Sequence, residues 1–267
     1  MSETSYETLL LERDPKGVLE IRLNRPEKHN AFNATVIEEL KRAFEEASEE
    51  EGVRVVLLTG SGKSFSAGAD IDWMRDQGRE SEAANVQSAL RMSEMFYAVY
   101  ACKKPVLAKV GGAALGGGTG LVAAVDIAIA SQDAIFGFTE VRLGIIPAVI
   151  SPFAVEKLGP ATARSLFLLG KRFNGIEAER LGLVFRSVPA AELDAEVENC
   201  LADLLRGSPK ALEEAKALAQ SLNPIPPLRE IPRCAEAIAK IRGTPEAQEG
   251  LSAFLERRRP SWFPENK

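Results

Sequence analysis

The segment 109–126 constrains the fold more than any other part of this chain, because six of the ten residues from 111 to 120 are glycine. A strand-like apolar run at 105–110 precedes it, and a helical apolar run at 121–125 follows. Glycine allows a close backbone approach, and a helix N-terminus presents unpaired N–H groups with a partial positive charge. The segment therefore predicts a strand, a tight turn and a short buried helix whose N-terminus suits a phosphate or an oxyanion. A close-packed turn between two core elements is the structural alternative.

Composition narrows the class of protein. The 267 residues are 45% hydrophobic and 27% charged, as in ordinary globular proteins, and the net charge of -5 argues against nucleic-acid binding. Three distant cysteines and a single histidine, His29, predict neither a disulfide framework nor a metal site nor a Ser-His-Asp triad. No apolar run reaches membrane-spanning length, and residues 1–6 lack the apolar core of a signal peptide. We therefore expect a cytoplasmic protein with no membrane partner.

The predicted elements indicate an α/β core followed by a helical extension. Apolar runs predict strands at 6–12, 17–23, 55–58, 105–110, 127–130 and 134–138. Capping residues and helical periodicity predict helices at 33–50, 81–101, 121–125, 150–158, 160–169, 175–181, 190–206, 208–222, 231–241 and 244–259. Because nearly all elements after residue 188 are helical, we place the core at 1–190 and the helical extension at 191–267.

A second turn rich in glycine and alanine follows the strand at 55–58. Gly62-Lys63-Ser64 is similar to the end of a phosphate-binding P-loop, but that motif needs glycine where this chain has Leu57. The turn continues through Ser66 to Asp70 and Asp72, and these two acidic residues favour the first turn of a helix. Ser66 has no evident base to activate it, so we interpret it as a turn residue rather than a nucleophile.

Glu140 is a candidate acid-base residue. It stands between an apolar strand and an apolar turn. A carboxyl group in apolar surroundings has a raised pKa and suits proton transfer near neutral pH. A solvent-facing glutamate is the structural alternative.

Four motifs occur in one order along the chain: Leu23-Asn24-Arg25-Pro26 with Asn30-Ala31-Phe32, the run 65–70, Ala114-Leu115-Gly116-Gly117-Gly118, and the run 139–144. In this order and spacing they resemble the crotonase superfamily, the enoyl-CoA hydratase/isomerase fold, nearly from end to end. The resemblance implies a spiral of ββα turns. It also implies C-terminal helices that form a homotrimer or a dimer of trimers and cover the active site. The implied substrate is an acyl-CoA thioester, with no separate cofactor because coenzyme A is part of that substrate.

The resemblance also implies roles for individual residues. The backbone N–H groups of Ala69 and Gly117 would bind the thioester carbonyl oxygen and stabilise an enolate-like oxyanion. Glu140 would handle the proton at the α-carbon. No metal ligand is implied. The residues implied to contact the CoA ester are Lys28, Ala31, Ser66, Ala67, Gly68, Ala69, Asp70, Ile71, Gly116, Gly117 and Arg257.

One position departs from the family pattern. Two-base hydratases carry a second glutamate where this chain has Gly120. Two enzyme interpretations therefore stay open: a hydratase in which Glu140 acts alone, and a Δ3,Δ2-enoyl-CoA isomerase in which Glu140 moves a proton between two carbons. The dehalogenase and dienoyl-isomerase branches carry an aspartate where this chain has Ala148, so we set both aside. A non-catalytic CoA-binding protein is the third interpretation.

The hydratase interpretation is favoured because the motifs look closest to bacterial methylglutaconyl-CoA hydratase-like members. Those members also tend to carry glycine at the position of Gly120. A glycine there is expected to leave room for a branched or carboxylated acyl chain. Arg142 is a candidate partner for such a carboxylate, and a surface ion pair is its structural alternative.

Overall fold

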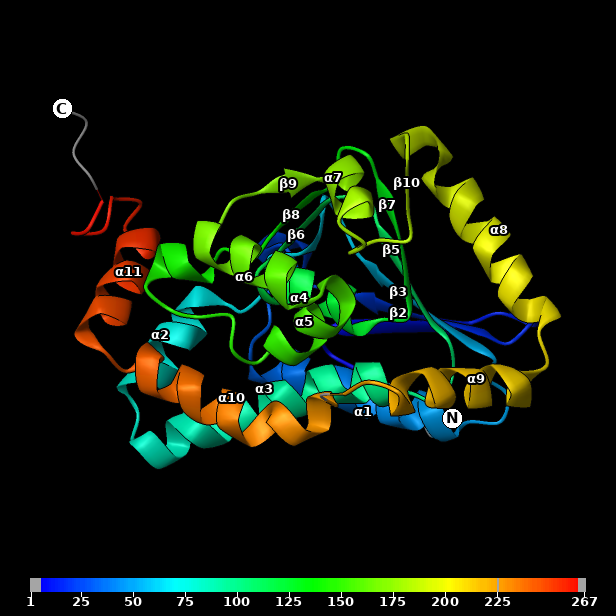
Figure 1. The fold of residues 1–267 in the computed structure, drawn as a ribbon, viewed down its shortest axis with the longest axis horizontal. Coiled ribbons are helices and arrows are strands. Elements are labelled where there is room, and N and C mark those ends of the chain that lie inside the picture. The colour runs from blue at the N-terminus through cyan, green and yellow to red at the C-terminus, as the bar shows by residue number, and fades with distance from the viewer. Residues whose placement is uncertain (1–5, 225, 264–267) are drawn as a thin grey trace.

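Two β-sheets form the centre of the protein, which is seen here as a computed structural model that describes residues 6–224 and 226–263 (Figure 1). The six-stranded sheet has the order β1 (Leu9–Arg13), β2 (Val18–Leu23), β3 (Val55–Gly60), β5 (Val106–Val110), β7 (Ile127–Ser131) and β10 (Arg186–Val188). The four-stranded sheet has the order β4 (Ser64–Ser66), β6 (Ala113–Leu115), β8 (Ile135–Gly137) and β9 (Phe173–Asn174). Neighbouring strands are parallel except in the pairs β1–β2 and β8–β9, which are antiparallel.

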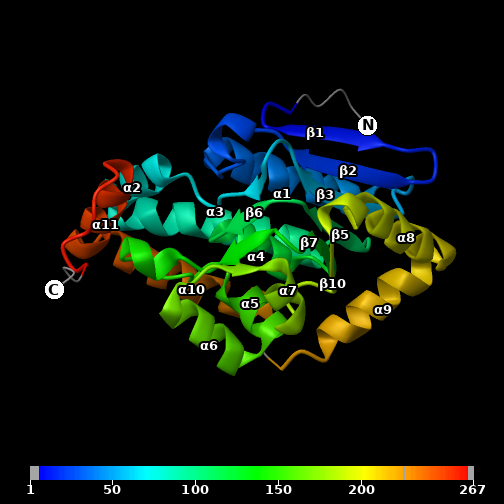
Figure 2. The same ribbon diagram turned by 90° about the horizontal axis from the view of Figure 1, so that it is seen from above.

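Helices surround both sheets. They are α1 (Ala34–Glu49), α2 (Ile71–Arg79), α3 (Glu82–Ala101), α4 (Gly117–Ala124), α5 (Ser151–Leu158), α6 (Pro160–Leu169), α7 (Gly175–Arg180), α8 (Leu193–Arg206), α9 (Pro209–Ser221), α10 (Pro227–Arg242) and α11 (Pro245–Leu255). Short 3₁₀ turns occupy η1 (Pro26–Lys28), η2 (Glu140–Leu143) and η3 (Ala190–Glu192). Helices α2 and α11 lie together at one end of the molecule and α8 and α9 lie at the other (Figures 1 and 2), while α10 packs along α3.

Most of the predicted elements are present. The two N-terminal strands form the expected hairpin, and the side chain of Asn33 caps α1 by accepting a hydrogen bond from Val36 N at 3.0 Å. Two helices after residue 220 have a bound that differs from the prediction by four residues. Helix α10 begins at Pro227 rather than residue 231, because proline is tolerated in the first turn of a helix. Helix α11 ends at Leu255 rather than residue 259, because Arg257 adopts a left-handed φ of 54°.

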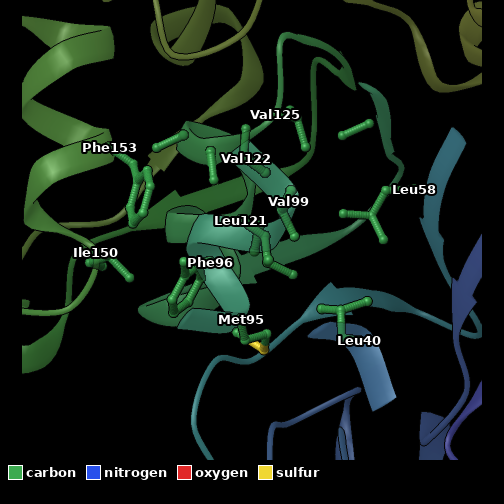
Figure 3. Close-up of a cluster of buried hydrophobic side chains, with 14 of the residues drawn as sticks. Leu40, Leu58, Met95, Phe96, Val99, Leu121, Val122, Val125, Ile150 and Phe153 are labelled. Carbon is green, nitrogen blue, oxygen red and sulfur yellow. The ribbon is translucent and has the colours of Figure 1, made fainter. Parts of the chain in front are cut away.

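The glycine-rich segment forms the expected strand and short buried helix, but the helix begins earlier than predicted, at Gly117. Every residue of α4 after Gly117 is buried, as expected for a helix that is apolar on all sides. Figure 3 shows Leu121 and Val122 of this helix in a cluster with Phe96, Val99 and other buried side chains. Helix α4 is therefore the centre of the core.

None of the helices in residues 6–224 and 226–263 combines the length and apolarity needed to cross a bilayer.

Two backbone segments cross beside α4 without space for side chains between them. A Cβ atom on Gly112 would lie 2.0 Å from the carbonyl oxygen of Lys63, and one on Gly118 would lie 2.2 Å from that of Ser66. A Cβ atom on Gly68, whose φ is +85°, would lie 2.7 Å from the backbone nitrogen of Gly117. Glycine is therefore required at the crossing, which holds the turn after β4 against the N-terminus of α4.

Candidate active site

A cavity of about 70 Å³ lies beside the backbone crossing and is bordered by η2, α2, α3 and α10. Six of the residues singled out from the sequence line it: Ala67, Ala69, Ile71, Gly116, Gly117 and Glu140. The rest of the wall is largely apolar, and Glu140 and Arg242 are the ionisable residues among the described ones that line it. An apolar wall with a few convergent polar groups is the usual lining of a small-molecule site.

Two backbone N–H groups at the crossing have no acceptor among the described residues: those of Ala69 and Gly117. Their neighbours are bonded: Ala67 N donates to the His29 carbonyl at 2.9 Å and Gly116 N to the Gly137 carbonyl at 2.8 Å. The Gly68–Gly117 contact places the two free N–H groups on adjoining segments of backbone. An oxygen that develops negative charge can accept from both, with the N-terminus of α4 adding its partial positive charge.

Ser66 holds the turn in place. Its buried hydroxyl donates to the Asn30 carbonyl at 2.9 Å and accepts from Gly68 N at 3.1 Å. The side chain of Asn30 donates to the carbonyls of Ser61 and Ser64 at 2.9 and 2.8 Å. Ser66 is therefore a turn residue, as interpreted from the sequence, and it positions Gly68 and Ala69 rather than facing the cavity.

Glu140, the first residue of η2, brings a carboxyl group to the edge of the same turn. A Cβ atom on Gly116 would lie 3.2 Å from Glu140 Oε1, so glycine at this position leaves space for the carboxyl group. The Oε2 atom is buried and has no hydrogen-bond partner among the described residues. Burial raises the pKa of Glu140 to about 7, against a small opposing effect of a hydrogen bond from its own backbone N–H. Near neutral pH this group can both accept and donate a proton.

The remaining predicted residues lie outside the cavity wall. Asp70 caps α2 by accepting from Asp72 N at 3.2 Å, and its carboxylate lies 3.6 Å from Arg25. Ala31 is buried, and its carbonyl accepts from Arg25 Nη1 at 2.7 Å. These contacts shape the turn.

Two predicted phosphate contacts, Lys28 in η1 and Arg257 after α11, are solvent-exposed and do not line the cavity. Their roles toward coenzyme A stay predictions.

The expectation that Gly120 leaves room for an acyl chain is wrong. A Cβ atom on Gly120 would meet Ile150 Cγ2 at 2.3 Å and Phe96 Cε1 at 3.3 Å. Figure 3 shows Ile150 beside Phe96 in the buried cluster. Ile150 lines the cavity and Gly120 does not. An apolar side chain therefore fills the space beside Gly120.

The prediction that Arg142 is a candidate partner for a carboxylate of the acyl chain is also wrong. Its Nη2 donates to the carbonyl of Leu169 at 2.9 Å, at the end of α6, and the exposed side chain lies outside the cavity wall. Arg142 therefore satisfies a carbonyl at a helix C-terminus.

Sequence reasoning missed Arg242, the last residue of α10. It is only 1% exposed and lines the cavity. Helical spacing contains the signal, because Arg242 follows Ile238 by four residues and Ala235 by seven, which puts it on the buried face of the helix.

Comparison with known proteins shows the family of the chain. The family model described as enoyl-CoA hydratase/isomerase matches residues 13–265. The chain belongs to the enoyl-CoA hydratase/isomerase family. A crotonyl-CoA hydratase of Syntrophomonas wolfei is 35% identical over 97% of this chain and 99% of the relative.

Solved structures of the enoyl-CoA hydratase/isomerase family share the fold. An enoyl-CoA hydratase from Mycobacterium avium subsp. paratuberculosis K-10 superposes with a TM-score of 0.87 at 28% identity, over 97% of this chain and all of that one. An enoyl-CoA hydratase/isomerase from Pseudoalteromonas atlantica gives 0.83 at 27% identity, over 96% and all of the two chains. The crotonase-like α/β fold predicted from the motifs is confirmed.

We predict that Gly120→Ala destabilises the fold by about 1–3 kcal/mol, the usual cost of overpacking a core. Adding Ile150→Ala removes the closer methyl group, so the double variant should be more stable than the sum of the two single changes. Gly111→Ala is the control, because its nearest contact would be an ordinary 3.5 Å to Leu193 Cδ2. Urea unfolding measures the unsubstituted protein, both single variants, the double variant and the control, and strictly additive effects would contradict the packing described here.

We predict that Glu140→Gln stabilises the fold at pH 8 by on the order of 3 kcal/mol, because each tenfold change in an acid constant corresponds to about 1.4 kcal/mol. The folded protein holds this proton up to about pH 7, whereas the unfolded chain releases it near the ordinary value of 4.5. The gain should therefore be full above pH 7 and absent below pH 4.5. Glu51→Gln, at an exposed position, is the control. An equal gain at pH 4 and pH 8 would contradict the assignment.

Proposed function

We propose that this member of the family adds water to a 2-enoyl-CoA thioester, or removes it in the reverse direction, with Glu140 as its single acid-base group. The observation that carries the proposal is one buried carboxyl group, without a hydrogen-bond partner at Oε2 among the described residues, beside two free backbone N–H groups. Membership of the enoyl-CoA hydratase/isomerase family supports the thioester substrate.

The two N–H groups act on the thioester. The carbonyl oxygen accepts hydrogen bonds from Ala69 N and Gly117 N. When a nucleophile adds to the β-carbon, the electrons of the C2–C3 double bond move toward the carbonyl and form an enolate. Hydrogen bonds from fixed donors become stronger as that charge develops. In other enzymes one such donor lowers the activation free energy by about 3 kcal/mol.

Glu140 handles one proton of the water in two successive steps, and the other proton stays on the new hydroxyl group. The Glu140 carboxylate takes one proton from water as the water oxygen bonds to the β-carbon. The resulting carboxylic acid then gives that proton to the α-carbon while the enolate returns to the thioester. The product has gained one hydrogen and one hydroxyl group, and Glu140 is a carboxylate again. A pKa of about 7 suits both steps because neither form of the group is strongly favoured.

The proposal also covers the acyl group of the substrate and the oligomeric state of the enzyme. The motifs look closest to methylglutaconyl-CoA hydratase-like members, which supports a branched ester such as 3-methylglutaconyl-CoA. A relative named crotonyl-CoA hydratase supports a short straight-chain ester. The family resemblance also supports a homotrimer or a dimer of trimers.

A Δ3,Δ2-enoyl-CoA isomerase is the second candidate, and one observation favours it. Apolar Ile150 packs against Gly120, the position that carries the second glutamate in two-base hydratases. An isomerase needs a single base: Glu140 removes a proton from C2 of a 3-enoyl ester, the same N–H groups hold the dienolate, and Glu140 returns the proton at C4. No water enters this reaction.

Product masses, together with chromatographic comparison against a 2-hexenoyl-CoA standard, distinguish these candidates. Purified enzyme is mixed separately with crotonyl-CoA, 3-methylglutaconyl-CoA and 3-hexenoyl-CoA. Hydration adds one water to a 2-enoyl ester, and the preferred ester then defines the acyl group. Conversion of 3-hexenoyl-CoA to its 2-enoyl isomer without a gain in mass indicates the isomerase. Tight binding of every ester with no turnover would contradict both and indicate a CoA-binding protein.

We predict that Glu140→Gln lowers kcat by about 10²–10⁴-fold, the range for loss of a general acid-base group, while binding of a saturated acyl-CoA is retained. In the unsubstituted enzyme, kcat/KM for hydration should fall below pH 7, because the base must be ionised to accept a proton from water. Glu51→Gln should behave as the unsubstituted enzyme in both assays. Near-normal turnover by Glu140→Gln would assign the chemistry to another residue.

A further inference from the structure

Three residues of α2 and α3 fix the guanidinium of Arg242. Its Nε donates to Asn85 Oδ1 at 2.9 Å, and its Nη2 donates to the Asn85 carbonyl at 3.1 Å and to Ser88 Oγ at 2.7 Å. Nη2 also contacts Asn85 Oδ1. Its Nη1 has a single contact among the described residues, Met74 Sδ at 3.2 Å. One edge of the guanidinium is therefore fully bonded, and the other faces a thioether, which is a weak acceptor.

No carboxylate of residues 6–224 and 226–263 forms an ion pair with Arg242. The group is almost fully buried, and burial lowers the pKa of Arg242 to about 10, which still leaves it charged at neutral pH. The Trp73 ring, with its centroid 5.8 Å from the guanidinium carbon, and the C-terminal end of α10 offset part of the burial cost. A buried cation without an anion is nonetheless costly.

The cavity joins this cation to the reacting groups. Glu140, Ala69 and Gly117 line the same cavity as Arg242. Met74, which contacts Arg242 Nη1, lines it too, as do the apolar side chains of Ala89, Met92 and Ile238. An acyl chain whose thioester sits on the two N–H groups can therefore extend along apolar side chains toward a guanidinium.

We propose that Arg242 binds a carboxylate at the far end of the acyl chain, so that the substrates of this enzyme are enoyl-CoA esters with an acidic acyl terminus. A hydrogen bond from a charged guanidinium to a carboxylate is among the stronger ones in proteins, and Nη1 is the nitrogen of Arg242 that remains for it. Met74 Sδ gives up the Nη1 contact when the carboxylate binds. This inference rests on the proposed function for the position of the thioester. A purely structural Arg242, which ties α10 to α3, is the competing explanation.

Binding of saturated acyl-CoA esters tests the inference without turnover. Calorimetry compares succinyl-, glutaryl- and adipyl-CoA with butyryl-, valeryl- and hexanoyl-CoA, which have the same chain lengths and no terminal carboxylate. We expect the carboxylated ester to bind at least tenfold more tightly than its neutral counterpart at one chain length. Equal or tighter binding of the neutral ester at every length would overturn the inference.

Variants assign the preference to Arg242. Arg242→Met should remove it, and Arg242→Lys should retain part of it. Arg233→Met is the control, because Arg233 lies on the same helix with its side chain 80% exposed and paired with Glu230. A preference that survives in folded Arg242→Met would overturn the inference. If neither Arg242 variant folds, the ester comparison with the unsubstituted enzyme still decides it.

Turnover separates this inference from the proposed function. The unsubstituted enzyme is assayed with glutaconyl-CoA and with 2-pentenoyl-CoA, which has the same chain length and no terminal carboxylate. Faster hydration of glutaconyl-CoA supports both proposals. Equal hydration of the two esters without a binding preference overturns the carboxylate site alone. A binding preference for carboxylated esters without turnover of either supports the carboxylate site and contradicts the hydratase.

Discussion

The turn after β4 passes the N-terminus of α4 at a distance that excludes side chains. A Cβ atom on Gly68 would lie 2.7 Å from Gly117 N, and one on Gly118 would lie 2.2 Å from the Ser66 carbonyl oxygen. Replacing either glycine with a larger residue would displace backbone atoms, which cannot move aside as the end of a flexible side chain can. The crossing places Ala69 N beside Gly117 N, with no acceptor for either among the described residues. The buried hydroxyl of Ser66 and the packed core around α4 keep this arrangement rigid, which is what preorganised donors require.

Burial of Glu140 against this rigid turn sets its chemistry and also costs stability. An apolar wall that includes Ile150 keeps water from solvating the carboxylate, and the pKa rises to about 7. The fold stabilises the neutral acid, so the carboxylate form of Glu140 exists at neutral pH only at a cost in the free energy of folding. Arg242 presents the same pattern with the opposite charge, since it too is buried without a counter-ion among the described residues. Both groups line one cavity, where a bound ligand can offset the cost of burying them.

Local signals predicted most of the fold, and contacts between distant segments decided the rest. The cap at Asn33 and the helical periodicities depend on neighbouring residues, so they are readable from the sequence. The strand Ser64–Ser66 is three residues long and pairs with β6, almost fifty residues away, so no local pattern marks it. The resemblance of the motifs to a known family predicted that the residues of the crossing and Glu140 belong to one site. It failed at Gly120 because Ile150, thirty residues further along the chain, occupies that space. Arg242 was overlooked because a charged residue on a buried helix face is easily assigned to solvent.

The claim on which the mechanism depends is that Glu140 is a carboxyl group poised to change charge near neutral pH. A carbon-13 NMR titration of protein labelled at the glutamate carboxyl carbon measures this directly, with Glu140→Gln used to identify the resonance. We expect the Glu140 resonance to titrate with a midpoint near pH 7. A midpoint near the ordinary value of 4.5 would show a solvated carboxylate and would contradict the assignment of Glu140 as a group that changes charge near neutral pH.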